Sequence, residues 1–210
     1  MCNALKSGIK VCKESNAPSA LWNKSLNLYL RLLLTVLKAF RAPPIRPGEA
    51  VELRLRVLPT DLDLNGHMNN GRYLTLVDLG LVTAFVRSGF ARLCLKSKWR
   101  PMGGGSIVYF RRGLTLFQRF TLRFTIVGWD EYWSYCRFEF VREGQICATG
   151  FVKGAAARPG GGLVPTAEIY PALGHDAPSP PLPEELRAWI DSDRLLGARI
   201  REGVKNSPRE

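Results

Sequence analysis

One short segment holds most of the side chains in this chain that could do chemistry. Residues 59–73, PTDLDLNGHMNNGRY, contain two carboxylates, Asp61 and Asp63, three asparagines, and His67, which is one of only two histidines in the chain. Polar side chains packed this densely need hydrogen-bond partners or a catalytic task. Asp and Asn are also common in turns and helix caps, so a polar turn before a helix is the alternative interpretation.

The residues that follow offer groups that would complement a carboxylate. Asn69 or Asn70 can cap a helix. The first backbone amides of that helix would then be unpaired, with the positive end of the helix dipole behind them. A carboxylate facing such amides suits acyl transfer, because the amides polarise a carbonyl group while the carboxylate activates water or attacks directly.

The elements on either side must position this segment. Residues 51–57 alternate between apolar and charged side chains, which is typical of a half-buried strand. Residues 70–95 are largely apolar and predict one long helix. Gly80 inside that helix would be costly unless another segment packs very close to it.

After residue 105 the apolar spacing changes to two, and the pattern predicts four successive strands, over residues 106–110, 119–127, 132–141 and 145–152. One strand, one long helix and four antiparallel strands indicate an α+β fold in which a single sheet wraps around a single helix.

Composition divides the chain into four parts. We expect a disordered basic arm, an amphipathic basic helix with a Pro-rich linker, the α+β domain, and a Gly- and Pro-rich tail with a short helix; their bounds are 1–20, 21–47, 48–156 and 157–210. The arm lacks the long apolar core of a secretory signal. The tail is expected to run extended over residues 157–181.

The charge is concentrated near the start of the chain. The net charge is +12, from 30 Lys and Arg against 18 Asp and Glu. Residues 1–48 hold eight of the basic side chains and one acid, which is +7 of the +12. Such an excess suggests an anionic partner. Nucleic acid is disfavoured, because few aromatic side chains lie among these basic residues: Trp22, Tyr29 and Phe40.

Residues 21–42 predict a helix with one polar stripe, since Lys24, Arg31 and Lys38 are spaced by seven. Its longest run without a charge is far below the roughly 20 apolar residues needed to span a bilayer. In one interpretation the helix lies on an anionic membrane with its basic stripe toward the lipid phosphates. In the other it packs on the domain or in a dimer contact.

Cysteine and histidine usage limits the chemistry further. The five cysteines are an odd number without a C-x-x-C pair, which favours a reducing compartment, and we expect a cytoplasmic protein that can lie at the membrane periphery. Two histidines exclude a His-rich metal site. No metal and no cofactor is expected.

A family resemblance adds to this interpretation. Residues 61–70, DLDLNGHMNN, are very similar to the D-L-D-x-N-x-H-V-N-N stretch of plant acyl-ACP thioesterases. They also resemble the T-D-x-x-G-H-V-N-N-x-x-Y stretch of 4-hydroxybenzoyl-CoA thioesterase-like proteins, most of all the thioesterase superfamily member 6 type. The resemblance extends over residues 50–155. It implies a hot-dog fold, an antiparallel sheet wrapped around one long central helix, and an acyl thioesterase acting on acyl-CoA or acyl-ACP as a homodimer or tetramer.

The resemblance also implies roles for single residues. Asp63 corresponds to the catalytic carboxylate, and Asn65 and His67 correspond to the Asn and His beside it. Asp78 falls where many relatives place a helix glutamate. Asp61 is the rival carboxylate, for which a turn-stabilising role is favoured.

Further residues are expected to contact the substrate. The thioester carbonyl would lie at the helix N-terminus, beside Asn69, Asn70, Gly71 and Tyr73. Arg111 and Arg112 end a predicted strand and could meet the phosphates of coenzyme A. A solvated strand face is the alternative for both arginines.

Two other functions stay open. One is a non-catalytic hot-dog module that binds acyl chains or a membrane. The other is a hot-dog dehydratase, which would need His67 and Asp78 as a pair. The plant enzymes also carry a further carboxylate downstream of the histidine, and residues 97–112 contain none.

Overall fold

A single antiparallel sheet forms the centre of the molecule. The computed structural model describes residues 19–206, and the side chains of residues 28–200. The strands lie in the order β1-β3-β4-β5-β2. Their bounds are β1 Ala50–Arg56, β2 Arg100–Phe110, β3 Arg119–Trp129, β4 Ser134–Arg142 and β5 Gln145–Ala157. The predicted antiparallel α+β architecture is confirmed; β2, β3 and β5 are longer than their patterns indicated, whereas β4 begins two residues later and ends one residue later than predicted.

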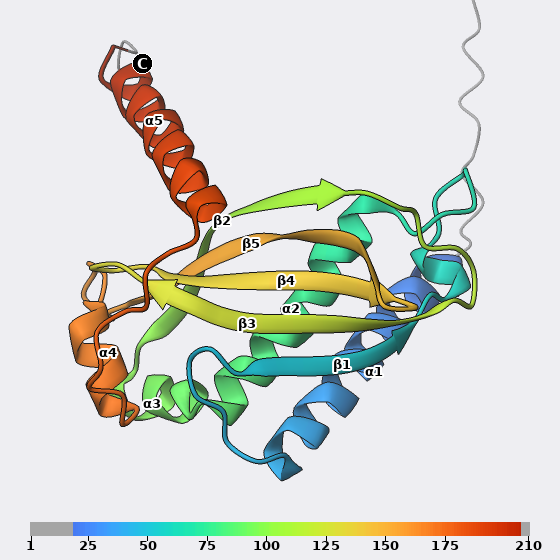
Figure 1. The fold of residues 1–210 in the computed structure, drawn as a ribbon, viewed down its shortest axis with the longest axis horizontal. Coiled ribbons are helices and arrows are strands. Elements are labelled where there is room, and N and C mark those ends of the chain that lie inside the picture. The colour runs from blue at the N-terminus through green and yellow to red at the C-terminus, as the bar shows by residue number, and fades with distance from the viewer. Residues whose placement is uncertain (1–18, 207–210) are drawn as a thin grey trace, which may run out of the picture.

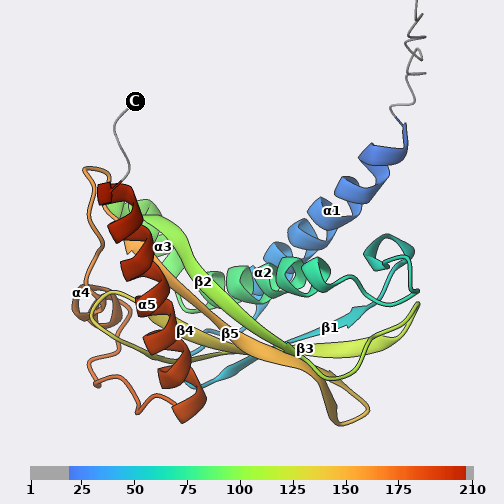
Figure 2. The same ribbon diagram turned by 90° about the horizontal axis from the view of Figure 1, so that it is seen from above.

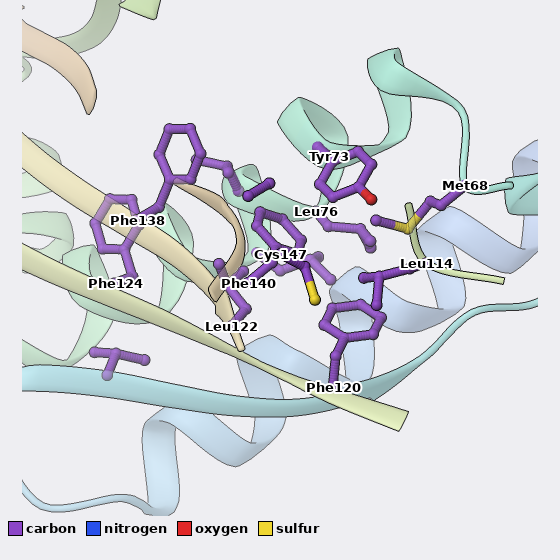
Figure 3. Packing of buried hydrophobic residues seen from close by; sticks show 14 of the residues in the cluster. Met68, Tyr73, Leu76, Leu114, Phe120, Leu122, Phe124, Phe138, Phe140 and Cys147 are labelled. Atoms are coloured by element: carbon purple, nitrogen blue, oxygen red, sulfur yellow. The ribbon is translucent and has the colours of Figure 1, made fainter. Parts of the chain in front are cut away.

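The sheet curves around helix α2, Asn70–Arg87, as Figures 1 and 2 show. The contact is tight at Gly80, where an added Cβ would lie 2.9 Å from the Cβ of Phe124 in β3. The close packing that the sequence demanded at this glycine is therefore present. In the core, Tyr73 and Leu76 of α2 meet an aromatic cluster from β3 and β4 (Figure 3), made of Phe120, Phe124, Phe138 and Phe140.

The central helix is shorter than predicted. The expected helix over residues 70–95 ends at Arg87, and a second helix, α3, spans Phe90–Ser97 at an angle of 73° to the first. Gly89 between them has a φ of +83°. This left-handed conformation ends an α-helix, and glycine adopts it at no steric cost. Phe90 then packs edge-on against Phe85, with ring centroids 4.8 Å apart.

The predicted N-terminal helix is present as α1, Ser19–Arg41, and it packs beside α2. The predicted disordered arm, residues 1–20, lies outside the described residues except for its last two. No single helix within residues 19–206 is long and apolar enough to cross a membrane, although α2 and α3 would pass that test together despite their bend.

The C-terminal segment packs on the domain instead of running extended. Residues 157–181 contain helix α4, Thr166–Ala172, whose Tyr170 stacks on Trp129 at 3.6 Å. Helix α5, Glu184–Asn206, covers the other face of the sheet with Leu186 and Ile190. That face carries Tyr135 and Phe151, and these apolar side chains need a cover. The prediction of an extended tail is therefore wrong. Residues 157–181 contain a helix, α4, and the helix that follows covers the apolar face of the sheet.

Alanine at position 80 should destabilise the domain, although alanine favours helices more than glycine does. Its Cβ would clash with Phe124. Overpacking costs about 1–3 kcal/mol, which exceeds the gain of about 1 kcal/mol in helix propensity. Denaturant unfolding measures the loss. Gly160→Ala, where nothing lies within 4 Å, is the matched control. A Gly80→Ala variant as stable as this control would contradict the packing.

Candidate functional site

The motif folds as a tight loop between β1 and α2. A 3-10 turn, Pro59–Asp61, leads into an isolated bridge between Leu62 and Met68. Within the bridge, the Gly66 N–H donates to the Asp63 carbonyl at 3.3 Å, and Gly66 has a φ of +76°. Glycine is favoured at such a turn position because it has no Cβ to clash. The Asp-Leu-Asn-Gly sequence therefore specifies this turn locally.

Asp61 is the structural carboxylate of the loop. Its side chain is 4% exposed and accepts a hydrogen bond from Arg31 Nη2 of α1 at 2.9 Å. The Leu58 N–H donates to the same oxygen at 2.9 Å, and Arg72 Nε lies 3.9 Å from the other oxygen. Its backbone carbonyl accepts from the Asn69 N–H at 2.8 Å. Asp61 thus joins α1, the loop and the start of α2, in agreement with the turn-stabilising role.

Asp63 is placed differently. Its Oδ1 accepts hydrogen bonds from the N–H groups of Asn65, at 2.8 Å, and His67, at 3.2 Å. Its Oδ2 has no partner among the described residues, and the side chain is half-buried. The turn therefore brings three of the predicted catalytic residues together. The bonds go to the backbones of Asn65 and His67, whose side chains are exposed.

A second segment packs against this loop. His67 forms a backbone bridge with Thr115, and the Met68 N–H donates to the Leu114 carbonyl at 2.7 Å. The His67 ring lies over Gly113, where an added Cβ would come within 2.6 Å of the ring. Sequence reasoning missed Gly113, because nothing local marks a glycine that only a distant side chain approaches.

The two arginines predicted to bind phosphate lie next to the glycine that packs under the His67 ring. Arg111 and Arg112 directly precede Gly113, and their N–H groups both donate to the Cys147 carbonyl, at 2.9 and 3.0 Å. Both side chains are exposed. Neither guanidinium has a carboxylate partner within the described part of the chain. They are free to receive an anion.

The start of α2 is capped as expected. Asn69 Oδ1 accepts from the Gly71 N–H at 2.9 Å, and Asn70 is exposed. Tyr73, in contrast, is 2% exposed, and its ring packs edge-on against Phe110 and Phe140. Burial raises the pKa of Tyr73. Asn69, Asn70 and Gly71 can therefore meet a ligand at the surface, whereas Tyr73 has the contacts of a core residue (Figure 3).

Asp78 belongs to another part of the site. It lies two turns along α2, about 12 Å from Asn70 at 1.5 Å per residue, at the rim of a cavity of about 510 Å³ between α2 and the sheet. Desolvation raises the pKa of Asp78. The structure does not pair Asp78 with His67, so the arrangement required for a dehydratase is not formed. The cavity is lined by neither Asp63 nor His67.

The cavity walls are mainly apolar. They include Phe124 and Ile126 of β3, and Ile169, Tyr170 and Leu173 from the C-terminal segment. Cys136 also lines the cavity, as a free thiol. Burial raises the pKa of Cys136 to about 12, so this thiol stays protonated at neutral pH and is a poor nucleophile. Among the described residues, no three His, Cys, Asp or Glu side chains cluster as a metal site.

The fold and the comparisons define the class of protein. An antiparallel sheet in the order β1-β3-β4-β5-β2, wrapped around one helix, is the hot-dog fold. The chain belongs to the thioesterase-like superfamily, whose family model matches residues 57–190. The family expected from the motif is confirmed.

Relatives and solved structures agree with this assignment. Protein THEM6 of Xenopus laevis is 28% identical over 188 residues, covering 87% of this chain and 88% of that protein. Protein THEM6 of Danio rerio is 31% identical over 135 residues, covering 60% and 67%.

The solved structures support the fold. The gentisyl-coenzyme A thioesterase BH1999 superposes with a TM-score of 0.50 at 18% identity, covering 55% of this chain and 94% of its own. The 1,4-dihydroxy-2-naphthoyl-CoA thioesterase Slr0204 from Synechocystis gives 0.53 at 12% identity, covering 60% and 95%. The Staphylococcus aureus protein SAV2348, solved in complex with CoA, gives 0.52 at 15% identity, covering 68% and 94%.

Asp61→Asn should be far more destabilising than Asp63→Asn. Removing the charge of Asp61 leaves the half-buried Arg31 without its partner, which costs about 3 kcal/mol or more. An asparagine at position 63 can still accept both backbone hydrogen bonds through its Oδ1, so its loss should stay under about 1 kcal/mol. Denaturant unfolding of both variants is the measurement. Equal stabilities would contradict these roles.

Asp78→Asn should raise the melting temperature at neutral pH. Desolvation raises the pKa of Asp78 above its ordinary 3.8, so the ionised carboxylate is less favourable in the folded than in the unfolded protein. This penalty is present above the raised pKa and vanishes as the pH falls below 3.8. The advantage of the variant should therefore shrink as melting curves are recorded at progressively lower pH. Asp191→Asn, exposed on α5, is the control, and an unchanged midpoint at neutral pH would contradict the argument.

Proposed function

We propose that this protein is an acyl thioesterase that hydrolyses acyl thioesters of coenzyme A, with Asp63 as the catalytic carboxylate. The observation that carries the proposal is the hydrogen bonding of the Asp63 carboxylate. One of its oxygens is held by the turn, and the other has no partner among the described residues. The superfamily, and neighbours that are named as CoA thioesterases, support the same reaction.

The chemistry follows from these groups. Asp63 Oδ2 takes a proton from a water molecule, and the oxygen of that water bonds to the thioester carbonyl carbon. The Gly71 N–H is held by Asn69 Oδ1, so an amide of the first turn of α2 that this cap leaves open would donate a hydrogen bond to the carbonyl oxygen as negative charge develops there. The C–S bond then breaks, the thiolate of coenzyme A takes up the proton, and the acid is released. Direct attack by Asp63, giving a mixed anhydride that water cleaves, is the second route with the same products.

Neighbouring residues would orient the substrate in this proposal. The side chains of Asn65 and His67 are exposed beside Asp63, where they can hold the water or the thioester. Arg111 and Arg112 stand within two residues of the glycine that supports the His67 ring, and their free guanidinium groups suit the phosphates of coenzyme A. An acyl-carrier protein, which presents a phosphopantetheine phosphate, is the alternative carrier.

The cavity beside α2 would take the acyl chain. Its volume of about 510 Å³ lies within the range typical of small-molecule sites. Asp78 at its rim is the second carboxylate that we assign to the reaction. Because Tyr170 and Leu173 of the C-terminal segment line the cavity, that segment would contribute to the choice of acyl group.

We further propose that the enzyme works as a homodimer, with a tetramer as the alternative. β2 is an edge strand, and its exposed side chains include Met102, Ile107 and Tyr109. An edge strand of this length has unpaired backbone groups that favour pairing with another chain. Two copies joined along β2 would extend the sheet across the dimer.

One observation favours a non-catalytic acyl-binding module as the second function. Asp63 does not line the cavity, so a bound acyl chain need not bring its carbonyl to the carboxylate. Binding of a fatty acid or acyl-CoA without hydrolysis would be the signature of this function.

Thiol release from acyl-CoA substrates of short, medium, long and aromatic type tests the proposal. The wild-type protein should release coenzyme A. Asp63→Asn should lower turnover by about 10²–10⁴ with little change in melting temperature, since the turn keeps its hydrogen bonds. Asn65→Ala and His67→Ala should lose less, because positioning is shared.

Asp191→Asn, on the exposed face of α5, should keep full turnover and serves as the matched control. If Asp63→Asn retained turnover within a few-fold of wild type, the assignment of Asp63 would be wrong. Absence of hydrolysis in the wild type, with acyl-CoA still bound, would support the binding module.

A further inference from the structure

Helix α1 presents an apolar face to solvent. Six large apolar side chains on this one helix are each between 43% and 72% exposed: Tyr29, Leu30, Leu33, Leu34, Leu37 and Phe40. At 100° per residue these positions fall within about 140° of the helix circumference, so they form one continuous strip. Single exposed apolar residues are ordinary, whereas a contiguous patch marks a contact with a partner or a membrane.

The opposite face of α1 is attached to the domain. Arg31 reaches Asp61 at 2.9 Å and the Arg56 carbonyl at 3.0 Å. Thr35 and Ala39, four and eight residues further on, are buried. The polar stripe predicted to face lipid phosphates therefore includes a residue, Arg31, that faces the domain. The ion pair holds the helix in the orientation that leaves its leucines outward.

Positive charge borders the apolar strip. Lys38 and Arg41 are exposed on the last turns of α1, and neither has a carboxylate partner within the described residues. At 100° per residue, both lie along one edge of the strip. The chain ahead of the described side chains, residues 1–27, adds four lysines against one glutamate. An apolar strip with basic residues at its edge matches the composition of an interfacial helix.

We infer that the outward face of α1 is a docking surface for an anionic lipid membrane. The helix would lie in the plane of the interface, with its leucines among the upper acyl chains. Lys38 and Arg41 would extend to the lipid phosphates through their long apolar stems. The attachment of α1 to the domain through Arg31 and Asp61 would then keep the whole hot-dog domain at the lipid surface.

Charge argues for a membrane over a second copy of this chain. A symmetric contact through α1 would join two helices that carry basic residues and no acidic ones, so Lys38 and Arg41 would gain no counter-charge from the other copy. The edge strand β2 already offers a second copy an uncharged row of backbone groups. Anionic lipid complements both features of α1 at once.

Flotation of the full-length protein with phosphatidylcholine vesicles, with and without a minority of phosphatidylserine, tests this inference. The wild type should bind the anionic vesicles and bind them less at high salt, because salt screens surface charge. Leu33→Glu with Leu37→Glu should weaken binding to anionic vesicles by at least about tenfold. Lys38→Glu with Arg41→Glu should weaken it by about tenfold or more, without lowering the weak binding to neutral vesicles.

Leu195→Glu with Leu196→Glu is the matched control, because both leucines are exposed on α5, at 74% and 62%. This control should bind vesicles as the wild type does, and every variant should keep the wild-type melting temperature because the substituted side chains are exposed. Failure of the wild type to bind vesicles would overturn the inference, as would an equal loss in the control. Light scattering that shows Leu33→Glu with Leu37→Glu splitting a dimer, with vesicle binding unchanged, would assign the face to a second copy.

Discussion

The structure around the motif depends on one buried ion pair, between Arg31 of α1 and Asp61 of the loop. A buried carboxylate needs a counter-charge and hydrogen bonds, and Asp61 obtains both from segments on either side of it. Through this residue α1, the 3-10 turn and the start of α2 are held in one arrangement. The pair sets the entrance to the central helix, and with it the position of the loop that holds Asp63 and of the first amides of α2.

The same pair separates two carboxylates that composition cannot distinguish. Asp61 and Asp63 flank Leu62, yet the first is sealed by cations and amides while the second keeps one oxygen without a partner among the described residues. Environment therefore favours a stabilising role for Asp61 and leaves Asp63 as the carboxylate that we propose for the chemistry. The tight turn at Gly66 supports this division, because it holds Asp63 by one oxygen only.

Helices on either side of the central sheet and helix adapt the fold in this chain. The family model begins at residue 57, so α1 precedes it. On the other side of the core, α4 adds Ile169 and Tyr170 to the wall of the cavity, and α5 covers the outer face of the sheet. The sheet and helix thus gain one wall of the cavity that we propose for the acyl chain, and an apolar outward surface along α1.

Local patterns in the sequence were sufficient for much of this architecture. Apolar residues at every second position predicted the strands, and Asn69 was one of two residues predicted to cap the helix. Gly80 predicted a close contact, which Phe124 provides. These features depend on neighbours within a few residues, or on a constraint that a single residue carries. The family motif similarly placed Asp63, Asn65 and His67 in one loop.

What only the tertiary structure decided involves partners far apart in the chain: Arg31 with Asp61 thirty residues later, His67 with Gly113, and Tyr170 with Trp129. The helical pattern of α1 was visible in its sequence, but which face turned inward was set by the charge of a buried aspartate, and no local periodicity records that.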